Sequence, residues 1–211
     1  VVGSDRRPCP ENFPTTFIET DLCDHTSARH VSDGADAVVH MGAIPGPGAD
    51  PDETFHNNMM STFHVMRAAQ EHGTRRIVFS SSAFGMGWAH DPAAFVPDYL
   101  PLDEDHLMMP FEPYGLTKQL GEGIGAMVAR SSATTVVSLR FTNVVSPERQ
   151  QEEFPWEAPT RQNPRTLVMW AYADPRDVAE SSDPGAGALS GLLDHQDIYS
   201  HTDHRLSDNF P

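Results

Sequence analysis

Residues 35–80 read ADAVVHMGAIPGPGADPDETFHNNMMSTFHVMRAAQEHGTRRIVFS. The apolar run 35–41 predicts a buried strand, and the glycines and prolines of 42–48 predict a loop. Asp50 and the proline after it are typical of a helix start, and apolar side chains then recur at near-helical spacing up to a glycine stop. Residues 75–80 predict a second apolar strand. This order of strand, helix and strand indicates a parallel unit.

The same alternation continues on both sides of this unit. Strands are predicted at 17–22 and 134–141, and helices at 26–32 and from Pro113 onward. We therefore expect residues 1–180 to form a parallel sheet of at least five strands with helices on both faces. Ligands of such sheets bind at the carboxyl ends of the strands.

Composition limits the function classes. The chain has 211 residues, a net charge of −16 and 38% hydrophobic residues, which suits one globular domain. The acidity and the lack of a basic patch argue against nucleic acid or a membrane surface as a partner. The acidic, lysine-poor surface fits either salt adaptation or a GC-rich genome. Without a signal-peptide core or a long apolar stretch, a cytoplasmic location is expected.

Neither cysteine nor metal chemistry is indicated. Cys9 and Cys23 show no metal-ligand spacing and can form at most one bridge, so a disulfide framework is excluded. Histidines and aspartates gather between 194 and 204, but without a convincing ligand spacing. We expect no metal site.

Tyr114 and Lys118 are the clearest candidates for chemistry. They are four residues apart at the start of a predicted helix, so their side chains share one face, and Lys118 is the only lysine in the chain. An ammonium at about 4 Å could lower the pKa of a phenol from about 10 to about 7, which suits a general acid/base. The alternative is an accidental pair. Ser80, Ser81 and Ser82 end a strand, either facing a pocket or forming a local turn.

Several blocks in this order resemble the extended branch of the short-chain dehydrogenase/reductase superfamily, the NAD-dependent epimerase/dehydratase family. The blocks are DLCD at 21–24, HMGA at 40–43, NN at 57–58, SSSA at 80–83, YGLTK at 114–118, LRFTNV at 139–144 and DPRDVA at 174–179. Each block is weak alone, and the ordered set is specific.

The resemblance implies an α/β fold, a Rossmann-like doubly wound parallel sheet. It implies NAD-dependent oxidation or epimerisation of a sugar or nucleotide-sugar hydroxyl, with Tyr114 taking the proton, Ser82 aligning the hydroxyl and Lys118 tuning the phenol. A homodimer through the helix carrying Tyr114 and the helix after Asn58 is also implied. The cofactor-binding residues implied are Asp5, Asp21, Leu22, Met41, Gly42, Ala43, Asn58, Ser80, Tyr114, Lys118, Phe141, Asn143 and Val144.

Two departures from the family pattern affect these expectations. The first strand-turn-helix unit, with its glycine-rich turn, is lacking from this sequence, and Val1 aligns with the start of the second strand. NAD binding of this chain is therefore expected to be millimolar or absent. Asp5 favours NAD, although Arg6 and Arg7 leave NADP open.

The second departure is at the other end of the chain. We expect an incomplete NAD(P)-binding domain over 1–180 and an atypical, poorly ordered tail over 181–211, because a serine, proline and glycine cluster stops any helix after residue 180. An inactive fragment or a non-catalytic ligand-binding relative is the alternative function.

Overall fold

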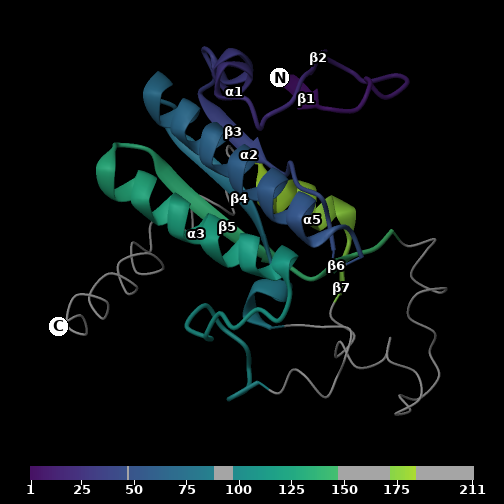
Figure 1. Cartoon of the computed structure of the whole chain (residues 1–211), viewed down its shortest axis with the longest axis vertical. Coiled ribbons are helices and arrows are strands. Elements are labelled where there is room, and N and C mark those ends of the chain that lie inside the picture. The colour runs from purple at the N-terminus through teal and green to yellow at the C-terminus, as the bar shows by residue number, and fades with distance from the viewer. Residues whose placement is uncertain (47, 88–96, 147–171, 184–211) are drawn as a thin grey trace.

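The computed structural model describes residues 1–46, 48–87, 97–146 and 172–183. Strands and helices alternate between residues 16 and 141, as the sequence predicts (Figure 1). The elements are β1 (Val2–Asp5), β2 (Thr16–Glu19), α1 (His25–Ser32), β3 (Ala37–His40), α2 (Pro51–His72), β4 (Arg76–Ser82), the 3-10 helix η1 (Ala83–Met86), α3 (Pro113–Ser131), β5 (Thr135–Phe141), β6 (Asn143–Val144), β7 (Tyr172–Ala173) and α5 (Pro175–Ser182).

The strand pairs of the described residues are all parallel, but they form three separate ladders. β3, β4 and β5 form the largest ladder, and β1 with β2 and β6 with β7 form the others. The expectation of parallel pairing is confirmed. The expectation of one continuous sheet of at least five strands is wrong for the described residues, because no hydrogen bonds join β1 to β3 or β5 to β6.

The strands differ in their bounds from the predicted ranges. β3 covers only Ala37–His40 of the predicted 35–41, and β5 begins at Thr135, one residue later than predicted. β2 ends at Glu19, because Asp21 turns the chain by accepting a hydrogen bond from the backbone N–H of Cys23 at 2.8 Å. β4 runs through Ser82, two residues further than predicted, because Ser81 and Ser82 stay in register with β5.

Capping explains the bounds of α2. The side chain of Asp50 accepts from the backbone N–H of Glu53 at 2.9 Å, and Pro51 stands in the first turn. Gly73 ends the helix with φ at 69°, a left-handed conformation that favours glycine. Start and stop are both as predicted.

The helix α3 lies unusually close to the central ladder. A Cβ added at Gly121 would lie 2.4 Å from the ring of Phe79, and one at Gly125 would lie 2.9 Å from Val136. Both glycines are buried. The core of this part of the chain consists of Met66, Ala69, Ile77, Phe79, Val128 and Val136.

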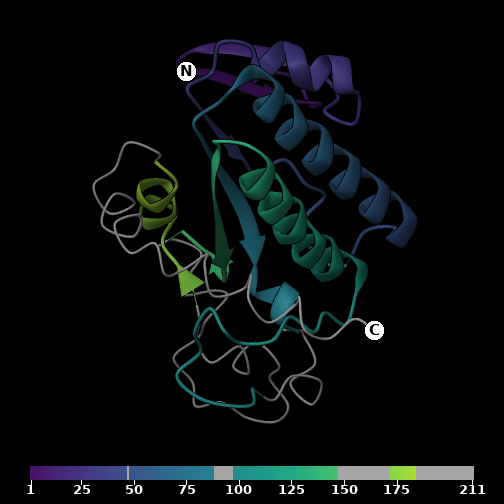
Figure 2. The same ribbon diagram turned by 90° about the vertical axis from the view of Figure 1, so that its left-hand side faces the viewer.

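Helices cover the strands from both sides, as expected of a doubly wound sheet. Figure 2 shows α2 and α3 on one side of β4 and β5, and α5 on the other. α5 ends at Ser182, near the predicted boundary at residue 180, and the tail beyond 183 lies outside the described residues. None of the helices in the described ranges is long and apolar enough to cross a membrane.

Candidate active site

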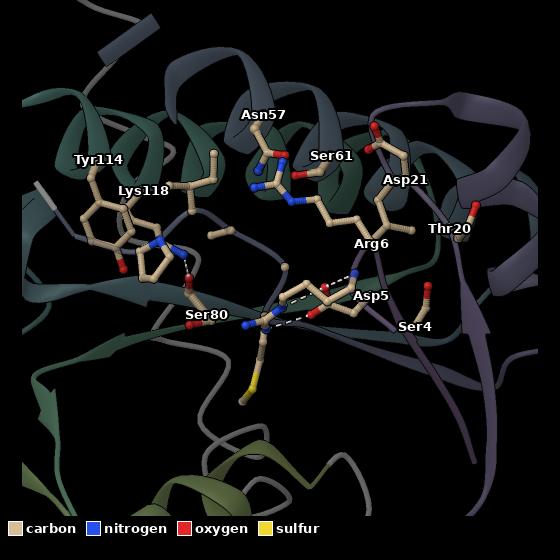
Figure 3. Close-up of a pocket in the computed structure, with 17 residues that line it drawn as sticks. Ser4, Asp5, Arg6, Thr20, Asp21, Asn57, Ser61, Ser80, Tyr114 and Lys118 are labelled. Atoms are coloured by element: carbon tan, nitrogen blue, oxygen red, sulfur yellow. Dashed lines mark hydrogen bonds and ion pairs between the residues drawn. The ribbon is translucent and has the colours of Figure 1, made fainter. Parts of the chain in front are cut away.

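A cavity of about 450 Å³ opens at the carboxyl ends of β1, β3 and β4 (Figure 3). One wall comes from β1 and the turn after β2, the floor from the segment after β3, and the other wall from α2, α3 and the end of β4. The lining residues are Ser4, Asp5, Arg6, Arg7, Thr20, Asp21, Leu22, Met41, Gly42, Ala43, Ile44, Pro45, Asn57, Ser61, Ser80, Tyr114 and Lys118.

Lys118 is held tightly in this cavity although its side chain carries an ammonium group. Its Nζ donates to the carbonyl oxygen of Ser80 at 2.5 Å and lies 5.2 Å from the ring centroid of Phe79 and 5.3 Å from that of Tyr114. Only 4% of the residue is exposed. Burial lowers the pKa of Lys118 to about 8, because it penalises the charged form.

Tyr114 and Ser82 also meet, as predicted. Burial raises the pKa of Tyr114, while the hydroxyl of Ser82, which hydrogen-bonds to it, lowers that pKa by a smaller amount. The expectation that Lys118 depresses this pKa is wrong. The reason is geometric, because the ammonium lies over the face of the ring and donates to Ser80 rather than to the phenol.

A smaller cavity of about 190 Å³ lies on the other side of Tyr114. It is lined by Gly46, Ser82, Ala83, Phe84, Tyr114, Thr142, Asn143 and Val144. Tyr114 is thus shared by both cavities. Its backbone N–H and that of Gly115 donate to the carboxylate of Glu112, at 2.7 and 2.6 Å, which caps α3 and fixes the helix start.

Asn58 lies behind the cavity wall and clamps three segments together. Its Oδ1 accepts from the backbone N–H of Ile44 at 2.7 Å, and its Nδ2 donates to the carbonyl of Ile44 at 3.1 Å and to the hydroxyl of Thr117 at 3.3 Å. Thr117 in turn donates to the carbonyl of Tyr114 at 2.7 Å. Asn58, which is 3% exposed, therefore supports the loop after β3 against α3 rather than lining the cavity.

The opposite wall is exposed, and its side chains pair both with sequence neighbours and with α2. Asp5 accepts from the backbone N–H of Arg7 at 2.8 Å and from its guanidinium at 3.0 and 3.2 Å. These hydrogen bonds lower the pKa of Asp5. Arg6 reaches across to α2, where its Nη1 lies 3.6 Å from Oε1 of Glu53.

His40 is a fully buried titratable group beneath the site. Its ring stacks on Phe79 at 6.0 Å, and its Nε2 lies 3.1 Å from the hydroxyl of Thr62. Burial, with a smaller effect of the charge on Lys118, lowers the pKa of His40 to about 3. The imidazole is therefore neutral at ordinary pH.

The structure brings most of the predicted residues together around the two cavities. The larger cavity has Asp5, Asp21, Leu22, Met41, Gly42, Ala43, Ser80, Tyr114 and Lys118, and the smaller one has Ser82, Tyr114, Asn143 and Val144. Asn58 and Phe141 line neither cavity.

The resemblance implies that Asn58 steadies the site, and its hydrogen bonds to Ile44 and Thr117 agree with that role. Asn57 and Ser61, one helical turn apart on α2, also line the cavity and were not predicted from the sequence. The spacing of four residues was a signal that could have found this pair. Among the described residues, no group of three or more His, Cys, Asp or Glu side chains could hold a metal ion.

The sequence profile described as the NAD dependent epimerase/dehydratase family matches residues 1–162. The chain belongs to this family. The resemblance stated from the motifs is thereby confirmed, and the Rossmann-like fold agrees with solved structures.

Relatives of this family match with modest identity. NAD-dependent glucose-6-phosphate dehydrogenase of Haloferax volcanii is 29% identical over 81% of the chain and 66% of its own length. UDP-arabinose 4-epimerase 1 of Arabidopsis thaliana is 29% identical over 69% of the chain and 35% of its own length. A short-chain dehydrogenase/reductase superfamily protein from Agrobacterium tumefaciens, solved with bound NAD, has a TM-score of 0.63 and 33% identity over 74% of the chain and 45% of its own. The chain thus spans between about a third and two thirds of these proteins.

Proposed function

We propose that this chain carries the nicotinamide-binding and proton-transfer groups of an oxidoreductase or epimerase that acts on a hydroxyl of a sugar or nucleotide sugar. One observation carries the proposal: Tyr114 lies between the larger cavity and the smaller one, with Ser82 hydrogen-bonded to it and Lys118 against its ring. A group that moves a proton between substrate and solvent must be reachable from the substrate side.

The larger cavity suits the adenosine half of NAD. Ser4 is one of its lining residues, and the hydroxyl oxygen of Ser4 is buried without a hydrogen-bond partner among the described residues. Such a group is costly to leave unpaired, so it favours a polar ligand. Asp5 and Asp21 offer carboxylates to ribose and adenine, and the segment 41–45 offers a floor. The solved relative with bound NAD supports this assignment.

The chain's own residues suit the proton chemistry. When bound, NAD supplies the hydride acceptor. We assign to Ser82 the alignment of the substrate hydroxyl, and to Tyr114 the acceptance of its proton. Lys118, whose ammonium is held at the carbonyl of Ser80 and against the ring of Tyr114, would donate a hydrogen bond to a ribose hydroxyl of the cofactor and so orient it beside the phenol.

The substrate class rests on the relatives and on the smaller cavity. Thr142, Asn143 and Ser82 offer hydroxyl and amide groups there, which suits a substrate rich in hydroxyls. The Haloferax volcanii relative is named for a sugar phosphate and the Arabidopsis thaliana relative for a UDP-sugar. Both kinds of sugar belong in the test.

The test combines binding with turnover. Titration calorimetry with NAD and with 5′-AMP should detect binding in the millimolar range, and Asp21→Ala should weaken both ligands. At saturating NAD, a panel of aldoses, sugar phosphates, uronates and UDP-sugars is then followed by nicotinamide absorbance and by product analysis. Hydride transfer to NAD or epimerised product supports the proposal, whereas NAD binding without turnover of any sugar supports the alternative of a non-catalytic relative.

A homodimer is a further part of the proposal. The residues Leu116, Leu120 and Met127 form a stripe along α3 and are 36 to 41% exposed, and Phe55 of α2 is 40% exposed. These apolar side chains suit a helix-to-helix interface between two copies. Light scattering after size exclusion should give twice the mass of the chain, and Leu120→Glu should restore the monomer.

A further inference from the structure

A polar cluster lies outside both cavities, on the α3 side of β4. Glu122 of α3 accepts three hydrogen bonds through its carboxylate. The hydroxyl of Ser81 donates to Oε1 at 2.5 Å, and Arg140 of β5 donates from Nε to Oε1 and from Nη2 to Oε2, each at 3.0 Å. Arg140 also donates from Nη1 to the carbonyl of Glu104 at 3.1 Å. One carboxylate therefore joins α3, β4, β5 and the segment before α3.

The cluster sits directly beside the catalytic groups in both elements. Glu122 follows Lys118 by four residues, so the two side chains leave the same side of α3 one turn apart. Ser81 follows Ser80, whose carbonyl oxygen receives the ammonium of Lys118. The helix is thus tied to the strand twice in succession, once through the lysine and once through the glutamate.

The hydrogen bonds of Lys118 and of Glu122 differ in number and geometry. Lys118 makes a single hydrogen bond at the end of a flexible stem, whereas Glu122 forms a bidentate pair with Arg140 plus the bond from Ser81. The pair is only about one fifth exposed, at 20% for Glu122 and 21% for Arg140. Solvent therefore screens it less than a surface ion pair.

The apolar packing of α3 sets its distance from the strands, and the polar cluster adds directed hydrogen bonds. Gly121 and Gly125 bring the helix close to Phe79 and Val136 and so set its distance from the sheet. These apolar contacts contain no directed bond to a particular atom of the strand. The bidentate hydrogen bonds of Glu122 do have fixed directions, so they add a specific alignment of α3 along β4 and β5.

We infer that Glu122, with Ser81 and Arg140, is a positioning residue that fixes the slide and rotation of α3 over the end of β4 and thereby places Lys118 at the carbonyl of Ser80. The effect of this positioning on catalysis rests on the proposed function. The position of Lys118 itself does not depend on that function.

The experiment uses the fact that Lys118 is the only lysine in the chain. Labelling with carbon-13 lysine gives one side-chain signal, whose pH titration measures the pKa of Lys118 in the full chain without any need for turnover. The titratable groups that face it are Tyr114 and the buried His40, and both are unchanged in every variant. The variants are Glu122→Gln and Ser81→Ala, and the control is Ser131→Ala, which removes a serine hydrogen bond from the far end of α3.

The direction of the change separates positioning from charge. If α3 shifts, Lys118 gains water, and its pKa rises from about 8 toward the ordinary value of about 10.4. Loss of the Glu122 charge alone would lower that pKa, because a nearby anion favours the ammonium. We expect a rise in Glu122→Gln and in Ser81→Ala, and none in the control.

Two outcomes overturn the inference. One is a lowered melting temperature with an unchanged or lowered pKa of Lys118, which would make the cluster merely structural. The other is an unchanged pKa in Ser81→Ala, which decides the question if Glu122→Gln does not fold. A raised pKa in a chain that turns over no sugar would leave the positioning intact and reject the proposed function. If turnover is present, kcat should fall while the KM for NAD stays within about twofold.

Discussion

The two walls of the larger cavity are built differently. Lys118, on the wall formed by α3 and β4, is 4% exposed and bonded to Ser80, a residue distant in the sequence. Arg7, on the wall formed by β1, has a side chain that is 80% exposed, and its hydrogen bonds to Asp5 join neighbours in the chain. The first wall, to which we assign proton transfer and which we call the proton-transfer wall, is therefore held by buried contacts between distant segments. The second, to which we assign the adenosine half and which we call the adenosine wall, is more exposed, and its links to other segments are the β1–β2 ladder and the exposed pair of Arg6 with Glu53.

The largest expected effect concerns the buried histidine under the proton-transfer wall. The pKa of His40 is about 3 in the folded chain and about 6.5 in an unfolded one. Between pH 3 and 6.5 the unfolded chain therefore binds a proton at His40 that the folded chain does not bind. The contribution of neutral His40 to the free energy of unfolding is thus fully present above pH 6.5 and is lost as the pH falls toward 3.

His40→Gln should remove several kcal/mol of that pH dependence, on the order of 1.4 kcal/mol for each unit of pKa difference. Urea unfolding of both chains across this pH window measures it. Parallel curves for the variant and the parent would show that the imidazole is not buried as described.

Tyr114→Phe should give the next largest effect. Removing the phenolic hydroxyl takes away the proton acceptor but leaves the cavity walls in place, so turnover should fall by about 10²- to 10⁴-fold while NAD binding is nearly unchanged. Steady-state rates and calorimetry measure the two quantities. Equal losses in both would mean that Tyr114 serves binding rather than chemistry.

Gly121→Ala tests the close approach of α3 to the central ladder. The new Cβ would lie 2.4 Å from the Phe79 ring, and overpacking of this kind costs about 1–3 kcal/mol of unfolding free energy. Gly123→Ala is the matched control, because nothing lies within 4 Å of its added Cβ. The control should stabilise the chain by about 0.5–1 kcal/mol through helix propensity. Equal values from thermal unfolding would contradict the packing described.

Arg7→Ala should have the smallest effect on the fold and tests the other wall. It frees the carboxylate of Asp5 for a ribose diol and removes a cation that could hold a 2′-phosphate. The melting temperature should not change, and the ratio of NAD to NADP affinity should rise a few-fold in calorimetry. A ratio that falls would mean that Arg7 helps to bind NAD.

The contrast between the walls also explains what the sequence could predict. The caps and periodicity of α2, and the pairing of Tyr114 with Lys118, are local signals, and both predictions are confirmed. That Asn57 and Ser61 line the cavity while Asn58 supports it from behind depends on how α2 is rotated against its neighbours, because adjacent helical residues point about 100° apart. The pKa of Tyr114 depended on where the ammonium of Lys118 comes to rest, which no spacing reveals.

The separation of the ladders was equally beyond local signals. Each strand is readable from its own residues, but whether β1 pairs with β3 depends on contacts across the fold. Predicting parallel pairing was possible because alternation with helices leaves few topologies.

The pKa of Lys118 is the most direct test of a preformed proton-transfer wall. A carbon-13 titration of the single lysine in the unmodified chain, without ligand, should give a value of about 8. A value near the ordinary lysine pKa of about 10.4 would show that the ammonium is solvated and that this wall does not exist before a ligand binds.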